Sequence, residues 1–116
     1  MPAALVTIVE SKAFSRRVAA LLSANERDRL IEFLAGNPLA GDVVEGTGGV
    51  RKVRFAAQGK GKSGGVRVIY YFYNRDLPLY ALLVYGKGER GDLSPDQRMA
   101  VSDFAAQVKA SRKRRT

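Results

Sequence analysis

Three strand-like runs follow one another in the second half of the chain with short connections, and this succession is the feature that most constrains the fold. They cover residues 50–56, 66–73 and 79–86, and their β-branched and aromatic side chains are typical of strands. The last two runs are joined by residues 74–78 (NRDLP), a sequence that suits a hairpin turn. Another β-branched run, at residues 5–9, predicts a short strand near the N-terminus.

Two helices are predicted between the first strand and the later three. Residues 12–22 carry apolar side chains at i, i+4 and i+7, which lie on one face of a helix. Ser23 and Glu26 have the spacing of a capping box, so a second helix is expected to begin there and to end at Gly36, before Asn37-Pro38. The short connection predicts an antiparallel helical hairpin.

A third helix is predicted after the last strand. Ser94 is expected to cap it, Pro95 occupies the first helical position, and Gln97 completes the cap. The order β-α-α-β-β-β-α indicates an α+β fold, in which a small antiparallel sheet carries the helical hairpin and the C-terminal helix on one face. Residues 1–110 are expected to form one domain, and residues 111–116 a basic tail.

Composition limits the possible functions of the chain. The net charge is +9, which attracts polyanions such as nucleic acid, an anionic membrane surface or an acidic protein. The chain has no histidine, so it lacks the usual general base at neutral pH and the commonest metal ligand. It also has no cysteine and no apolar run near the roughly 20 residues of a membrane span. We therefore expect a cytoplasmic protein without a metal or cofactor and without a membrane partner.

Strand alternation sorts the basic residues of the first two long runs onto faces. Val53 and Phe55 share one face of the first run, and Lys52 and Arg54 share the other. Burying the apolar pair leaves the two cations on an open face, and Arg67 of the next run joins them if the strands pair in sequence order. The open face is therefore expected to carry Lys52, Arg54, Arg67 and Lys87.

A face of this kind suits RNA, because cations bind phosphates and tyrosine rings stack on unpaired bases. The alternative is an ordinary solvated sheet face, which is also charged. The expected open positions contain cations and no carboxylate to balance them, which favours a binding function. The predicted additional RNA contacts are Lys60, Lys62, Tyr71, Tyr85 and Arg90.

The glycine-rich loop at residues 58–65 contains two apparent nucleotide-binding motifs. Gly59, Gly61 and Gly64 match G-x-G-x-x-G, and Gly61-Lys62-Ser63 matches the end of a P-loop. Both motifs require a helix directly after the loop, and a strand is predicted there instead. We therefore interpret the loop as a hairpin connection whose lysines and amides can contact phosphates.

Three segments of the chain form a recognisable pattern in this order, namely GGVRKVRF at 48–55, GKGKSGGVRVIYY at 59–71 and LLVYGKGERGDLS at 82–94. Together they resemble the RelE/ParE superfamily of bacterial toxins, most closely its RelE-like, HigB-type branch. The resemblance covers nearly the whole chain. It implies a microbial RNase-like fold and a ribosome-dependent endoribonuclease that cuts mRNA in the A site as the toxin of a type II toxin–antitoxin system.

The resemblance also implies roles for particular residues and partners. By motif position, the residues acting on the scissile phosphate are Lys52, Arg54, Arg67 and Lys87. The family pattern has an arginine and a late tyrosine where this chain has Gly88 and, approximately, Ser94. The implied partners are the ribosome with mRNA in its A site and a cognate antitoxin, normally a helix-turn-helix protein. Operator DNA is expected to be bound only through this antitoxin. Two alternatives stay open, namely a non-catalytic RNA- or protein-binding module and a ParE-like gyrase inhibitor.

Overall fold

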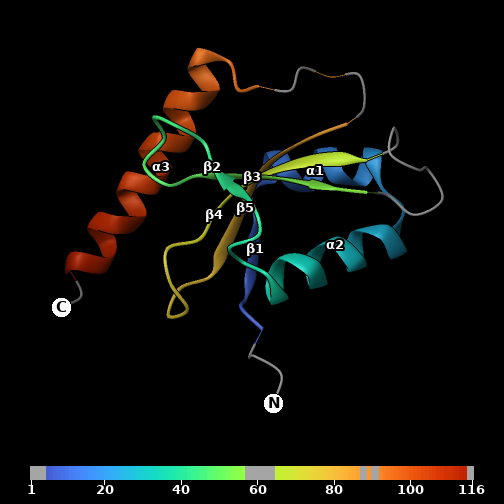
Figure 1. Ribbon diagram of the computed structural model, residues 1–116, viewed down its shortest axis with the longest axis horizontal. Coiled ribbons are helices and arrows are strands. Elements are labelled where there is room, and N and C mark those ends of the chain that lie inside the picture. The colour runs from blue at the N-terminus through green and yellow to red at the C-terminus, as the bar shows by residue number, and fades with distance from the viewer. Residues whose placement is uncertain (1–4, 57–64, 87–88, 90–91, 115–116) are drawn as a thin grey trace.

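A five-stranded mixed sheet forms the centre of the molecule (Figure 1). The computed structural model describes residues 5–56, 65–86, 89 and 92–114. The described part is α+β, as predicted. Its elements are β1 (Ile8–Glu10), α1 (Lys12–Leu21), α2 (Ala24–Gly36), β2 (Asp42–Val43), β3 (Arg51–Phe55), β4 (Val66–Tyr71), β5 (Leu79–Tyr85) and α3 (Pro95–Arg114).

The strand order across the sheet is β1-β5-β4-β3-β2. Strands β2, β3, β4 and β5 pair antiparallel with one another, and the pairing of β3, β4 and β5 in sequence order confirms the prediction. The prediction of a purely antiparallel sheet was wrong, because β1 pairs parallel with β5, with Ile8 opposite Leu79. Strand β2 was not predicted at all, since a strand of two residues is too short to show a period of two.

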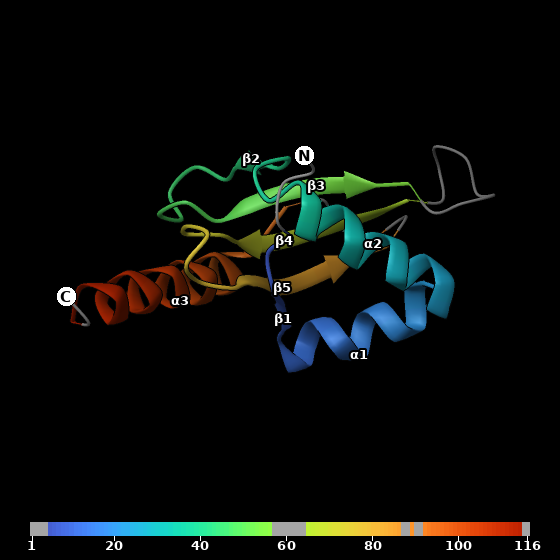
Figure 2. The same ribbon diagram turned by 90° about the horizontal axis from the view of Figure 1, so that it is seen from below.

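Helices cover both faces of the sheet, so the prediction of a single helical face was also wrong. Helices α1 and α2 pack on the face formed by Val68, Tyr70 and Ala81. Helix α3 packs on the opposite face through Val101 and other apolar residues, against Ile69, Tyr71 and Leu82. Figures 1 and 2 show the sheet between the helical hairpin and α3. None of the described helices is long and apolar enough to cross a membrane.

The predicted helix caps are present. The Ser23 hydroxyl accepts a hydrogen bond from the Glu26 amide, and the Glu26 carboxylate accepts one from the Ser23 amide. Ser94 and Gln97 form the same reciprocal pair at the start of α3. Helix α3 ends at Arg114, so residues 111–114 of the predicted tail are helical.

A buried tyrosine and a glycine-rich loop fix the part of the chain that leads into β3. The Tyr70 hydroxyl donates to the Pro38 carbonyl oxygen at 2.9 Å and accepts from the Gly41 amide at 2.8 Å.

Beyond β2, Arg98 and Lys109 of α3 donate to carbonyl oxygens of the loop at residues 44–49. Three loop glycines have positive φ angles, which glycine adopts without the steric cost of a Cβ atom, namely Gly46, Gly48 and Gly49.

Candidate nucleic-acid interface

Strands β3 and β4 bring three of the predicted site residues together. Arg54 lies directly opposite Arg67 in the antiparallel pair, and Lys52 lies two residues before Arg54 on the same face. The three side chains line one open hollow of about 450 Å³. The alternation of apolar and basic residues in β3 therefore predicted their shared face correctly.

The placement of two arginines opposite each other carries information about function. Like charges directly across a strand pair repel and destabilise the sheet. Arg54 is exposed and Arg67 is half-buried, so Arg67 is partly withdrawn from the water that would screen the repulsion. An anion bound between the two guanidinium groups would relieve this repulsion, because each group can donate paired hydrogen bonds to phosphate oxygens.

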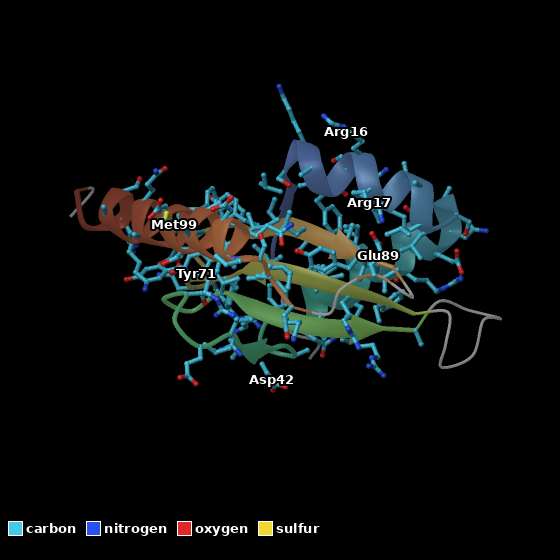
Figure 3. All side chains as sticks on the ribbon, turned by 90° about the horizontal axis from the view of Figure 1, so that it is seen from above. Arg16, Arg17, Asp42, Tyr71, Glu89 and Met99 are labelled. Carbon is cyan, nitrogen blue, oxygen red and sulfur yellow. The ribbon has the colours of Figure 1, made fainter. Side chains whose placement is uncertain are left out.

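Two carboxylates also line the hollow, contrary to the prediction of unbalanced cations. Asp92 Oδ1 lies 3.6 Å from Lys52 Nζ, and Asp42 of β2 lies opposite Lys52 in the strand register. Figure 3 shows Asp42 at the β2 edge of the sheet. The sequence did not reveal them, because Asp42 lies on an unpredicted strand and Asp92 on the connection to α3. The hollow therefore has mixed charge with an excess of cations.

Two predicted base-stacking residues are not accessible. Tyr71 is 2% exposed and Tyr85 is 9% exposed, because both lie in the apolar cluster under α3. The Tyr85 hydroxyl pairs with Gln97 Oε1 of α3 at 3.0 Å, and burial raises the pKa of Tyr71 above its ordinary value of 10.0. Both rings pack under α3, which leaves them no open face for stacking on RNA bases, contrary to the prediction. Figure 3 shows Tyr71 beside this helix.

Four further predicted site residues lie outside the described part of the chain. These residues are Lys60, Lys62, Lys87 and Arg90. The candidate interface consists of the hollow alone, lined by Asp42, Lys52, Arg54, Arg67 and Asp92.

An anchor for the segment after β5 was not predicted from the sequence. The Glu89 carboxylate accepts hydrogen bonds from the Gly86 amide and from the Arg17 guanidinium of α1. The Gly86 hydrogen bond, helped by Arg17, holds the pKa of Glu89 below its ordinary value of 4.5. Figure 3 shows Arg17 and Glu89 next to each other. The contact links the chain that leads toward Asp92 to the helical hairpin on the other face of the sheet.

The chemistry available in the hollow is that of cations and carboxylates. Within residues 5–56, 65–86, 89 and 92–114, no three acidic, histidine or cysteine side chains gather as metal ligands would. Guanidinium groups stabilise negative charge on phosphate oxygens, and an amine or a carboxylate can accept a proton. No family model matches the sequence.

Proposed function

We propose that the protein is the toxin of a type II toxin–antitoxin system and acts as a metal-independent endoribonuclease on mRNA in the ribosomal A site. The observation that carries the proposal is the hollow in which Lys52, Arg54 and Arg67 converge, with Arg54 directly opposite Arg67. The resemblance of three sequence segments to the RelE/ParE superfamily supports it. The net charge of +9 supports it as well, since such a chain is attracted to RNA.

In the proposed reaction, the ribose 2′-oxygen attacks the adjacent phosphorus and the bond to the 5′-oxygen of the next nucleotide breaks. Lys52 accepts the proton of the 2′-hydroxyl. Arg54 and Arg67 stabilise the negative charge that builds up on the phosphorane oxygens. Lys87 supplies a proton to the leaving 5′-oxygen. The products are a 2′,3′-cyclic phosphate and a free 5′-hydroxyl.

The ribosome enters the proposal as the partner that positions the substrate. The hollow is open and has no histidine, so it is expected to cleave free RNA slowly. Fixing the mRNA with its 2′-hydroxyl in line with the scissile bond contributes several kcal/mol to catalysis, up to about 7–11 kcal/mol in the best cases. A cognate antitoxin with a helix-turn-helix domain is the expected inhibitor, and it would neutralise the toxin in the cytoplasm.

The test is the double variant K52A/R67A in a translating extract, with mRNA cleavage read by primer extension in the presence and absence of ribosomes. We expect ribosome-dependent cleavage by the unaltered protein and a loss of at least about 100-fold in the variant, since each group contributes to the transition state. The matched control is K12A/R16A, which removes two exposed cations from α1. Figure 3 shows Arg16 on this helix, on the far side of the sheet from Asp42. Undiminished cleavage by K52A/R67A would refute the assignment of the site.

A second candidate function is a binding module that holds RNA without cutting it. The observation that favours it is the Asp92–Lys52 ion pair, which places a counter-ion on the proposed general base. RNA binding that K52A/R67A weakens, with no cleavage by any form of the protein, would support this function. Growth arrest that persists in K52A/R67A and leaves mRNA intact would instead favour the ParE-like inhibition of gyrase, which an ATP-dependent gyrase-poisoning assay would detect.

A further inference from the structure

The charges around the hollow nearly cancel. Its lining contains the three cations Lys52, Arg54 and Arg67 and the two carboxylates Asp42 and Asp92, so the formal sum is 3 − 2 = +1. A simple polyanion site would gain affinity by losing both carboxylates. Their presence on the same surface as the three cations therefore needs a reason.

Neither carboxylate has the surroundings of a structural ion pair. The Asp92 side chain is 89% exposed and lies 3.6 Å from Lys52 Nζ, and exposed pairs of this kind contribute little to stability. Asp42 is exposed on β2, at the edge of the sheet. Both carboxylates lie where they repel a bound anion, and that repulsion grows in proportion to the charge of the anion.

We infer that Asp42 and Asp92 are specificity-determining residues, which lower the preference of the cationic hollow for a doubly charged phosphomonoester over a singly charged phosphodiester. The inference rests on the proposed function and deepens it by defining the substrate class. An internal linkage of RNA carries one negative charge, whereas a terminal phosphate carries nearly two above its second pKa of about 6. The two carboxylates then favour the interior of an RNA strand relative to RNA ends that carry a phosphomonoester.

The test compares two small ligands that the protein cannot cleave, because neither has a 2′-hydroxyl next to its phosphate. They are thymidylyl-3′,5′-thymidine, a diester with one charge, and thymidine 3′-monophosphate, a monoester with two charges at pH 8. Their dissociation constants are measured by NMR titration at low salt for the unaltered protein, D92N, D42N and the control D28N. Asp28 is exposed on α2, on the other side of the sheet, so D28N removes the same charge at a distance.

We expect each carboxylate to weaken binding of the monoester more than binding of the diester, because its repulsion doubles with the charge of the ligand. Removing one carboxylate should tighten diester binding about two- to five-fold, and monoester binding by the square of that factor, roughly four- to 25-fold. The dissociation constant of the monoester divided by that of the diester should therefore fall in D92N and in D42N. The same ratio should stay unchanged in D28N.

Three outcomes would overturn the inference. They are an equal change for both ligands, the same shift in D28N, and a failure of the unaltered protein to bind the diester. A loss of cleavage in D92N with unchanged binding ratios would assign Asp92 to the chemical step instead. Each of these outcomes can be told apart from a refutation of the proposed function. The proposed function is refuted only if the protein does not cleave mRNA or if K52A/R67A still cleaves it.

Discussion

At the scale of single residues, Tyr70 joins the chain before β3 to the centre of the sheet. Its hydroxyl satisfies both the Gly41 amide and the Pro38 carbonyl in a site from which water is excluded. Removing one partner from a buried hydrogen bond costs about 1–3 kcal/mol, because the remaining group stays desolvated. We expect Y70F to lower the free energy of unfolding by this amount in urea denaturation. The control Y73F, at an exposed ring, should change it by less than about 0.5 kcal/mol.

The raised pKa of Tyr70 predicts that the stability of the protein depends on pH in the alkaline range. Burial raises the pKa of Tyr70 above its ordinary value of 10.0, although the Gly41 hydrogen bond and Arg51 oppose the shift. A pKa that is higher in the folded state gives a contribution to stability that is complete below pH 10.0 and is lost as the pH rises toward the folded value. The stability difference between the unaltered protein and Y70F should therefore narrow above pH 10.0. A difference that stays constant to higher pH would contradict the assignment.

Residue patterns predicted the candidate site only in part. Alternation in β3 and β4 was enough to place Lys52, Arg54 and Arg67 on one face, because a period of two is a local property of the strand. It could not show that α3 covers Tyr71 and Tyr85 on that same face, since coverage depends on contacts distant in sequence. The carboxylate of Asp92 was missed for the same reason, because its neighbour Lys52 lies 40 positions earlier in the chain.

At the scale of elements, the sequence of β4 indicates a sheet that is covered on both faces. Val66, Val68 and Tyr70 on one face and Ile69 and Tyr71 on the other are all buried. Strands that are buried on both faces have nearly continuous apolar sequences, whereas a strand with one solvated face alternates. The sequence VRVIYY departs from alternation over its last four residues. This pattern indicates that a helix lies on each side at that end.

Helix α3 also holds the loop between β2 and β3. Arg98 donates to the Glu45 carbonyl and Lys109 donates to the Gly48 carbonyl at 2.6 Å, and the loop closes through the Val44 amide and the Val50 carbonyl. We expect R98M/K109M to speed hydrogen exchange at the Val44 amide about two- to 12-fold, the equivalent of one ordinary hydrogen bond.

Two comparisons test this role of α3. Exchange at the buried Val68 amide should be unchanged in R98M/K109M, because β4 keeps both of its neighbouring strands. The exposed pair K12M/R16M should leave the loop unaffected. Equal exchange at Val44 in R98M/K109M and the unaltered protein would show that the loop holds its conformation without α3.

At the scale of the whole molecule, the net charge of +9 makes salt dependence a test of the proposed RNA site. Each phosphate neutralised on a single strand contributes about −0.7 to the slope of log K against log salt concentration. If Lys52 and Arg67 each neutralise one phosphate, K52A/R67A should make the slope less steep by about 1.4. K12A/R16A removes the same charge from α1 and should leave the slope within about 0.3 of the original. Fluorescence anisotropy with a non-cleavable oligonucleotide would measure both, and identical slopes for the two variants would place the RNA elsewhere.

The parallel pairing of β1 with β5 affects the order in which the chain acquires its structure during synthesis. The Ser11 hydroxyl donates to the Leu82 carbonyl across 71 residues, and α1 packs on the same late strand. The N-terminal helical hairpin therefore has no complete surface to pack against until β5 has been made, and such distant contacts slow folding. A nascent chain that ends before residue 79 lacks the strand next to β4, so the face that bears the basic hollow forms late. The topology thus delays completion of the hollow until most of the chain has been synthesised.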